Sequence, residues 1–141
     1  QTFPWRWKWK MRYLNEQEWK LASRFLFLSM ALKVIKHDLQ KMNQLSPFKI
    51  NEPYIALLEK MEKNATEERR NLRKQMYQEK IKVVAAEKND SFTSYLFLCK
   101  GKEEKRNYFN PAIRKKVELI LEELLAHAYE STSSSKKEVK L

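Results

Sequence analysis

Apolar side chains recur between residues 21 and 42 with the longest regular spacing in the chain. They are separated alternately by four and three positions, at Leu21, Phe25, Leu28, Leu32, Ile35, Leu39 and Met42. This spacing places them on one face of an α-helix. Asn15 and Glu18 come just before the repeat and are three positions apart, as in a capping box at a helix N-terminus. The sequence therefore predicts a helix from about residue 16 to about residue 45.

A second apolar stripe joins the first in the middle of this segment, at Phe27, Met30, Ala31 and Val34. A helix that carries two apolar stripes is buried on more than one side. We therefore expect the middle of this helix to form the spine of the core.

Glycine, cysteine and histidine are scarce, and their scarcity excludes several classes of protein. The single glycine among 141 residues excludes P-loops and dinucleotide-binding loops, which need glycine-rich turns. One cysteine, Cys99, leaves no intramolecular disulfide or cysteine-based zinc site, and two histidines leave little material for another metal site. We expect no cofactor and no metal. Aromatic residues make up 12% of the chain, which is too rich for a disordered protein.

The first residues alternate without exception between apolar and basic side chains. The apolar ones are Trp5, Trp7, Trp9, Met11 and Tyr13, and the basic ones are Arg6, Lys8, Lys10 and Arg12. A period of two is that of a β-strand. Residues 5–13 are therefore predicted to form a strand with one apolar face and one basic face.

Proline and turn residues divide the rest of the chain. Ser46-Pro47 ends the first helix, and Pro53 marks the first turn of a second helix, predicted from 52 to 79, most of which faces water. Three short antiparallel strands follow, at 81–86, 92–100 and 105–109. The second of these is apolar on both faces and is predicted to be the central strand.

A final helix is predicted to follow Pro111 and to end at about residue 130. Its inward residues are expected to be Ile113, Val117, Ile120 or Leu121, Leu124 and Leu125. These elements give an α+β fold in the order β-α-α-β-β-β-α, with about three helices packed on an antiparallel sheet of three to four short strands. Residues 1–130 are expected to be a single globular domain, and the Ser- and Lys-rich residues 131–141 a disordered tail.

The order α-β-β-β-α over residues 52–130 resembles the double-stranded-RNA-binding domain. That family places a lysine pair after a glycine-containing loop at the start of its last helix, where it meets phosphate. Lys115 and Lys116 lie near the start of the last predicted helix here. The loop before them has no glycine, and the first of these helices is about twice as long as that fold uses. The resemblance implies phosphate contacts at the lysine pair.

The formal net charge of the chain is +11, and part of this excess positive charge is clustered in the sequence. Such a field favours a polyanionic partner. Two clusters are candidates for nucleic-acid binding. In the N-terminal strand, four basic residues would contact phosphates beside three tryptophans that stack on bases: Arg6, Lys8, Lys10 and Arg12, with Trp5, Trp7 and Trp9. On the second helix, Arg69, Arg70, Arg73 and Lys74, with Tyr77 and Lys80 one turn on, could track a phosphate backbone.

Both clusters also have a purely structural interpretation. The tryptophans would cover the sheet or the long helix, while basic side chains protect an edge strand from pairing with other chains. On the second helix, acidic residues lie toward the N-terminus and the basic residues from Arg69 onward lie toward the C-terminus. The helix dipole favours this distribution of charge, so it needs no ligand to explain it.

No spacing pairs His37, His127 or Cys99 with a catalytic partner, so we expect no catalytic residues and a protein that is not an enzyme. The sequence favours a small basic protein that associates with nucleic acid through the phosphate backbone, in a regulatory or accessory role. The alternative is a protein–protein adaptor or regulator, homodimeric or not, that uses the long first helix or the Trp-rich strand. No small-molecule substrate is evident.

A cytoplasmic location is expected, and a membrane surface is the less favoured partner, because no signal-peptide pattern or apolar stretch of about 18 residues occurs.

Overall fold

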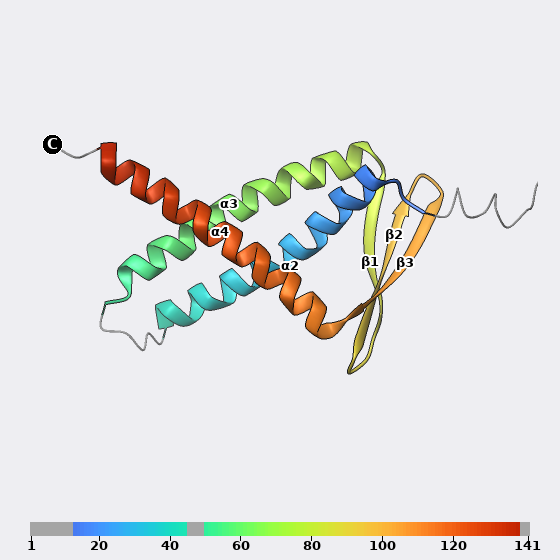
Figure 1. Cartoon of the computed structure of the whole chain (residues 1–141), viewed down its shortest axis with the longest axis horizontal. Coiled ribbons are helices and arrows are strands. Elements are labelled where there is room, and N and C mark those ends of the chain that lie inside the picture. Colours follow the sequence, from blue (N-terminus) through green and yellow to red (C-terminus); the bar gives the residue numbers. More distant parts are fainter. Residues whose placement is uncertain (1–12, 45–49, 139–141) are drawn as a thin grey trace, which may run out of the picture.

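The computed structural model describes residues 13–44 and 50–138, which form three helices and a three-stranded antiparallel sheet. The element order is α2 (Glu16–Gln44), α3 (Glu52–Gln78), β1 (Ile81–Lys88), β2 (Phe92–Cys99), β3 (Lys102–Phe109) and α4 (Asn110–Glu138). In Figure 1 the sheet lies at one end of the molecule, beside the start of α2 and the end of α3, and α4 crosses both helices. The predicted α+β class is confirmed. The strand predicted at 5–13 lies outside the described residues except for Tyr13, which is in a bend.

The capping box at the start of α2 forms as predicted. The Glu18 N–H donates a hydrogen bond to Asn15 Oδ1 (2.8 Å), and the Asn15 N–H donates to Glu18 Oε1 (2.9 Å). The first N–H groups of a helix have no backbone partner in a preceding turn, and these two hydrogen bonds satisfy the N–H groups of Asn15 and Glu18. Both α2 and α3 end one residue before their predicted last residues.

The sheet has the order β1-β2-β3, which confirms β2 as the central strand. A two-residue turn joins β2 to β3, and both of its residues have positive φ angles, 48° at Lys100 and 83° at Gly101. This is the backbone of a tight hairpin, where glycine adopts positive φ without steric cost. Because the turn needs only these two residues, β3 begins at Lys102, three positions earlier than predicted.

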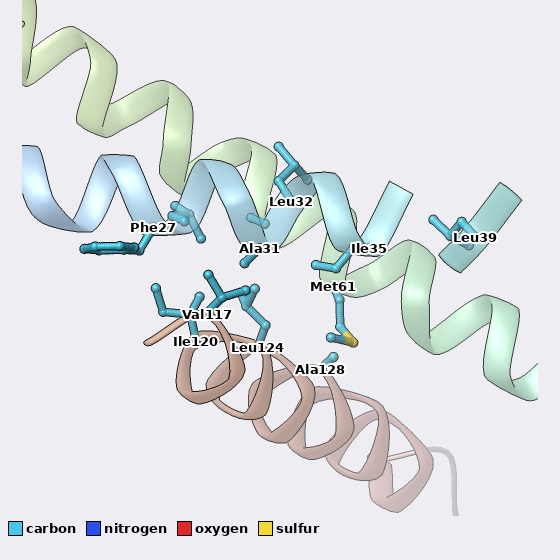
Figure 2. Packing of buried hydrophobic residues seen from close by; sticks show 12 residues of the cluster. Phe27, Ala31, Leu32, Ile35, Leu39, Met61, Val117, Ile120, Leu124 and Ala128 are labelled. Atoms are coloured by element: carbon cyan, nitrogen blue, oxygen red, sulfur yellow. The ribbon is translucent and has the colours of Figure 1, made fainter. Parts of the chain in front are cut away.

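Two clusters of buried side chains form the core. The first lies between the three helices, and Figure 2 shows Leu32 and Ile35 of α2, Met61 of α3 and Leu124 of α4 among its members. The second lies between the sheet and the start of α2 and is centred on Phe97, which is fully buried. The middle of α2 contributes Phe27, Leu28 and Ala31 to the first cluster, so two sides of this helix are buried as expected.

Three sequence predictions are corrected. Helix α4 continues to Glu138, eight residues beyond the predicted boundary of the domain, so the expected disordered tail overlaps the end of this helix. The Ser- and Lys-rich stretch contains no glycine or proline, and extending a formed helix is far easier than starting one. Leu125 and Val34 were expected to face the core but are 44% and 38% exposed. Each is adjacent to a residue that is buried in its place, Leu124 beside Leu125 and Ile35 beside Val34.

Candidate nucleic-acid interface

The C-terminal half of α3 presents a basic surface to solvent. Arg70, Arg73 and Lys74 are exposed, and Tyr77, one turn further on, is 86% exposed. Together with Gln78 they line a shallow depression of about 330 Å³. We call the three cations and Tyr77 the α3 basic face.

This face forms because α3 is amphipathic. Its inward stripe contains Met61, Ala65 and Met76, which are buried against the rest of the molecule. Side chains three, four and seven positions apart share one side of a helix, so Arg70, Arg73 and the residues after them gather on the opposite side.

The cations of the α3 basic face have no acidic partner among the described residues. None of Arg70, Arg73 and Lys74 forms an ion pair with another residue in the described part of the chain. They lie in the C-terminal half of the helix, before its last turn. Three cations and an exposed phenol ring suit the phosphates and bases of a nucleic acid.

Arg69 belongs to the same sequence cluster but not to this face. Its Nε donates a hydrogen bond to Ser29 Oγ (2.8 Å), and its guanidinium lies 4.8 Å from the centre of the Phe25 ring. Arg69 therefore joins α3 to α2. Of the five basic residues predicted for this cluster, the structure brings together Arg70, Arg73 and Lys74 on one face and turns Arg69 away. The fifth, Lys80, lies after the helix, in the turn before β1.

Glu68, which directly precedes the cluster, pairs with a residue of another helix. Glu68 accepts two hydrogen bonds from Arg24, at 2.7 and 3.0 Å, and Glu123 of α4 lies 2.8 Å from the same guanidinium. The hydrogen bonds from Arg24 to Glu68, with a smaller contribution from Glu123, raise the pKa of Arg24 despite its partial burial. This network joins the three helices.

The predicted lysine pair, Lys115 and Lys116, is exposed near the start of α4. Lys116 lies 5.5 Å from the centre of the Phe27 ring, at the groove between α2 and α4. Its ammonium is stabilised there by the π-electrons of the ring.

A buried polar cluster joins the start of α2 to the sheet. Glu18, only 7% exposed, accepts hydrogen bonds from Lys102 Nζ (2.9 Å) and from the Cys99 thiol (3.2 Å). Burial, followed by the hydrogen bond to Glu18, raises the pKa of Cys99, so this thiol is a poor nucleophile. Sequence reasoning found Glu18 as a capping residue but missed its contacts with β2 and β3, which no local pattern reveals.

The described residues offer no metal centre and no membrane-spanning helix. No group of three or more His, Cys, Asp or Glu side chains in residues 13–44 and 50–138 could hold a metal ion. No helix in the same ranges has the length and apolar character that crossing a bilayer requires.

Comparison with known proteins identifies the family. The family model described as YhjD protein matches residues 13–129. The chain belongs to the YhjD family. It is 35% identical over 111 residues to the uncharacterized protein YhjD of Bacillus subtilis (strain 168). The aligned residues make up 79% of this chain and 92% of that protein. No solved structure matches the chain, so the resemblance to the double-stranded-RNA-binding domain remains one of element order.

The part of this YhjD family member that matches the family model contains the α3 basic face and the whole sheet. The other predicted binding residues lie outside the described part of the chain: Trp5, Trp7, Trp9, Arg6, Lys8, Lys10 and Arg12. The geometry of the candidate site therefore rests on α3 alone.

Proposed function

We propose that this protein associates with nucleic acid through the α3 basic face, in a regulatory or accessory role and without enzymatic activity. The observation that supports this is the set of three exposed cations beside Tyr77, which form no ion pair within residues 13–44 and 50–138. Arginine and lysine at such a surface neutralise phosphates and release bound counterions, which binds nucleic acid without reading its sequence. The exposed phenol ring adds a stacking surface for an unpaired base.

The N-terminal segment belongs to the same proposal. Its basic residues Arg6, Lys8, Lys10 and Arg12 would add phosphate contacts, and Trp5, Trp7 and Trp9 would add stacking. A cytoplasmic location follows from this function and is part of the proposal.

The test is a fluorescence-anisotropy titration of labelled duplex and single-stranded oligonucleotides across a salt series. We compare the wild-type protein with the triple variant R70Q/R73Q/K74Q. The matched control is K33Q/K36Q/K41Q, which removes the same charge from exposed positions on α2. On duplex DNA each phosphate contact contributes about 0.9 to the slope of log affinity against log salt. The α3 variant should lower that slope by about two to three, and the control by less than one.

Two further variants separate the contributions. Y77A should weaken binding to the single strand about fivefold or more and leave duplex binding nearly unchanged, because only an unpaired base can stack on the ring. Removal of residues 1–12 measures the N-terminal contribution. If the α3 variant and the α2 control lose the same affinity, binding depends on net charge and not on the α3 basic face, which would contradict the proposal. Absence of binding at low salt would also refute it.

A further inference from the structure

The sheet has an apolar face that none of the described helices α2, α3 and α4 covers. Alternate residues of a strand point to opposite faces. On one face, Ile81, Phe97 and Cys99 pack against the helices as part of the second core cluster. The other face carries Val84, Leu96, Leu98, Phe92 and Phe109, none of which belongs to either core cluster. We call this second surface the outer sheet face.

The apolar residues of the outer sheet face form two groups. Val84 pairs with Leu96 in register, and Phe92 pairs with Phe109 with ring centres 5.6 Å apart. Val84, Phe92 and Phe109 are 44–51% exposed. Ser94 and Asn107, which are hydrogen-bonded to each other, lie between these two pairs on the same face. An antiparallel sheet with one face in water usually carries polar residues on that face, so this many apolar side chains there indicate an interaction site.

The charges around the patch indicate what covers it. Lys82, Leu98 and Glu103 lie in one row across the three strands, since Lys82 pairs with Leu98 and Leu98 pairs with Glu103. One edge of the row is therefore positive, the other is negative, and the centre is apolar. Within the described residues, neither Lys82 nor Glu103 forms an ion pair.

This row is complementary to a copy of itself. A two-fold axis parallel to the strands and above β2 would place Lys82 opposite the partner's Glu103, and Glu103 opposite the partner's Lys82. Leu96 and Leu98 would meet their own copies at the centre. In the next row, Val84 would meet the aliphatic stem of the partner's Lys105, which covers apolar surface well. Two sheets packed in this way lie about 10 Å apart with nearly aligned strands.

We propose that the outer sheet face is the interface of a symmetric homodimer, whose occupant is a second copy of this chain. Three strands of eight residues give a footprint about 26 Å long and about 14 Å wide. This is about 360 Å² per partner, which is smaller than the interfaces of stable dimers, so the dimer is a weak one that dissociates reversibly, with a Kd of roughly 10–100 µM. The interface is separate from the α3 basic face, and dimerisation leaves that face free.

Sedimentation velocity of the full chain without nucleic acid, from about 1 to 200 µM, tests the proposal. The mass should rise with concentration from that of the 17.1 kDa monomer toward twice that value. The single variants K82E and E103K should each weaken the dimer about tenfold or more, because each sets like charges opposite one another at two places. Both positions are exposed, so the fold is retained, and circular dichroism checks this.

Charge exchange gives the decisive result. The double variant K82E/E103K should dimerise like the wild type, and a mixture of the two single variants should form a heterodimer, because opposite charges again face one another. A control variant, K33E, lies on α2 and should leave the dimer unchanged. A monomer at all concentrations would overturn the proposal, as would a dimer that neither single variant weakens. A chain that dimerises only after residues 1–12 are removed would assign the face to that segment and not to a second copy.

Discussion

Glu18 offers the most direct test of how the first helix is joined to the sheet. Its carboxylate accepts hydrogen bonds from the Asn15 N–H (2.9 Å), from Lys102 Nζ (2.9 Å) and from the Cys99 thiol (3.2 Å). Glutamine at this position keeps the shape but loses the charge, and one of its two terminal atoms cannot accept a hydrogen bond. The variant Glu18→Gln should therefore destabilise the fold.

The magnitude follows from the burial of the two partners. Removing one partner of a buried ion pair costs about 3–5 kcal/mol, and a hydrogen bond to a charged group contributes about 1.5–3 kcal/mol. The Lys102 side chain is 28% exposed, against 9% for Glu18, so its ammonium stays partly hydrated and the lower range applies. We expect a loss of about 2–3 kcal/mol in the free energy of unfolding. For a chain of this size that lowers the Tm by about 6–10 °C.

Urea denaturation followed by circular dichroism at pH 7 measures the effect. Glu16→Gln is the control, since Glu16 lies in the same helical turn but is exposed and pairs only with Lys20 across one turn. Its change should stay within about 0.5 kcal/mol. A loss in Glu18→Gln no larger than in this control would refute the reasoning that the buried carboxylate ties α2 to the sheet.

The pH dependence provides a second readout on the same pair of proteins. Burial raises the pKa of Glu18, but the hydrogen bonds from Asn15, Lys102 and Cys99 outweigh it, and the pKa in the folded protein lies below the ordinary value of 4.5. The carboxylate therefore adds stability at all pH values above the unfolded pKa, and this contribution is lost as the pH falls through the lower folded pKa. The difference between wild type and Glu18→Gln should shrink as the pH is lowered from 7 to about 3. A difference that stays constant would contradict the assignment.

Three further predictions concern the core around the sheet. Phe97→Ala should cost about 3–5 kcal/mol in urea denaturation, because Phe97 is fully buried and packs edge-on against Trp19 at 4.6 Å; a loss below about 1 kcal/mol would contradict this packing. Cys99 should react with a thiol reagent at pH 8 much more slowly in the native protein than in urea, because it is 1% exposed and burial raises its pKa; equal rates would show that the thiol is accessible. Burial raises the pKa of Tyr108 to about 12, and its hydroxyl is buried without a hydrogen-bond partner in the described part of the chain. Tyr108→Phe should therefore leave the stability unchanged or raise it, and a clear loss of stability would reveal a partner for the hydroxyl.

Local sequence signals predicted most of the fold. The start of α2 follows from Asn15 and Glu18, which bond each other within one turn, and the β2–β3 hairpin uses the only glycine of the chain. The position of β2 in the centre of the sheet follows from its apolar run. These features depend on residues close together in the sequence, so a pattern of a few positions is enough to determine them.

The candidate site was predicted less completely. Arg69 and Arg70 are adjacent and have the same chemistry, yet one bonds Ser29 on α2 and the other lies in solvent. Neighbouring residues on a helix point about 100° apart, and only the position of α2 decides which of them is turned inward. The packing of α2 against α3 therefore selects the three cations that can meet a ligand.

The sequence by itself determined which residues share a face of each helix and strand, because the periods of 3.6 and 2 are properties of the backbone. It could not determine which faces are covered. The apolar run of β2 predicted a central strand but did not indicate which of its faces is covered. Helices pack on the side of Phe97 and Cys99, whereas Leu96, Leu98 and Phe92 belong to neither core cluster of the described residues. Coverage depends on contacts between segments far apart in the chain, such as Glu18 with Lys102, and only the tertiary structure brings these segments together.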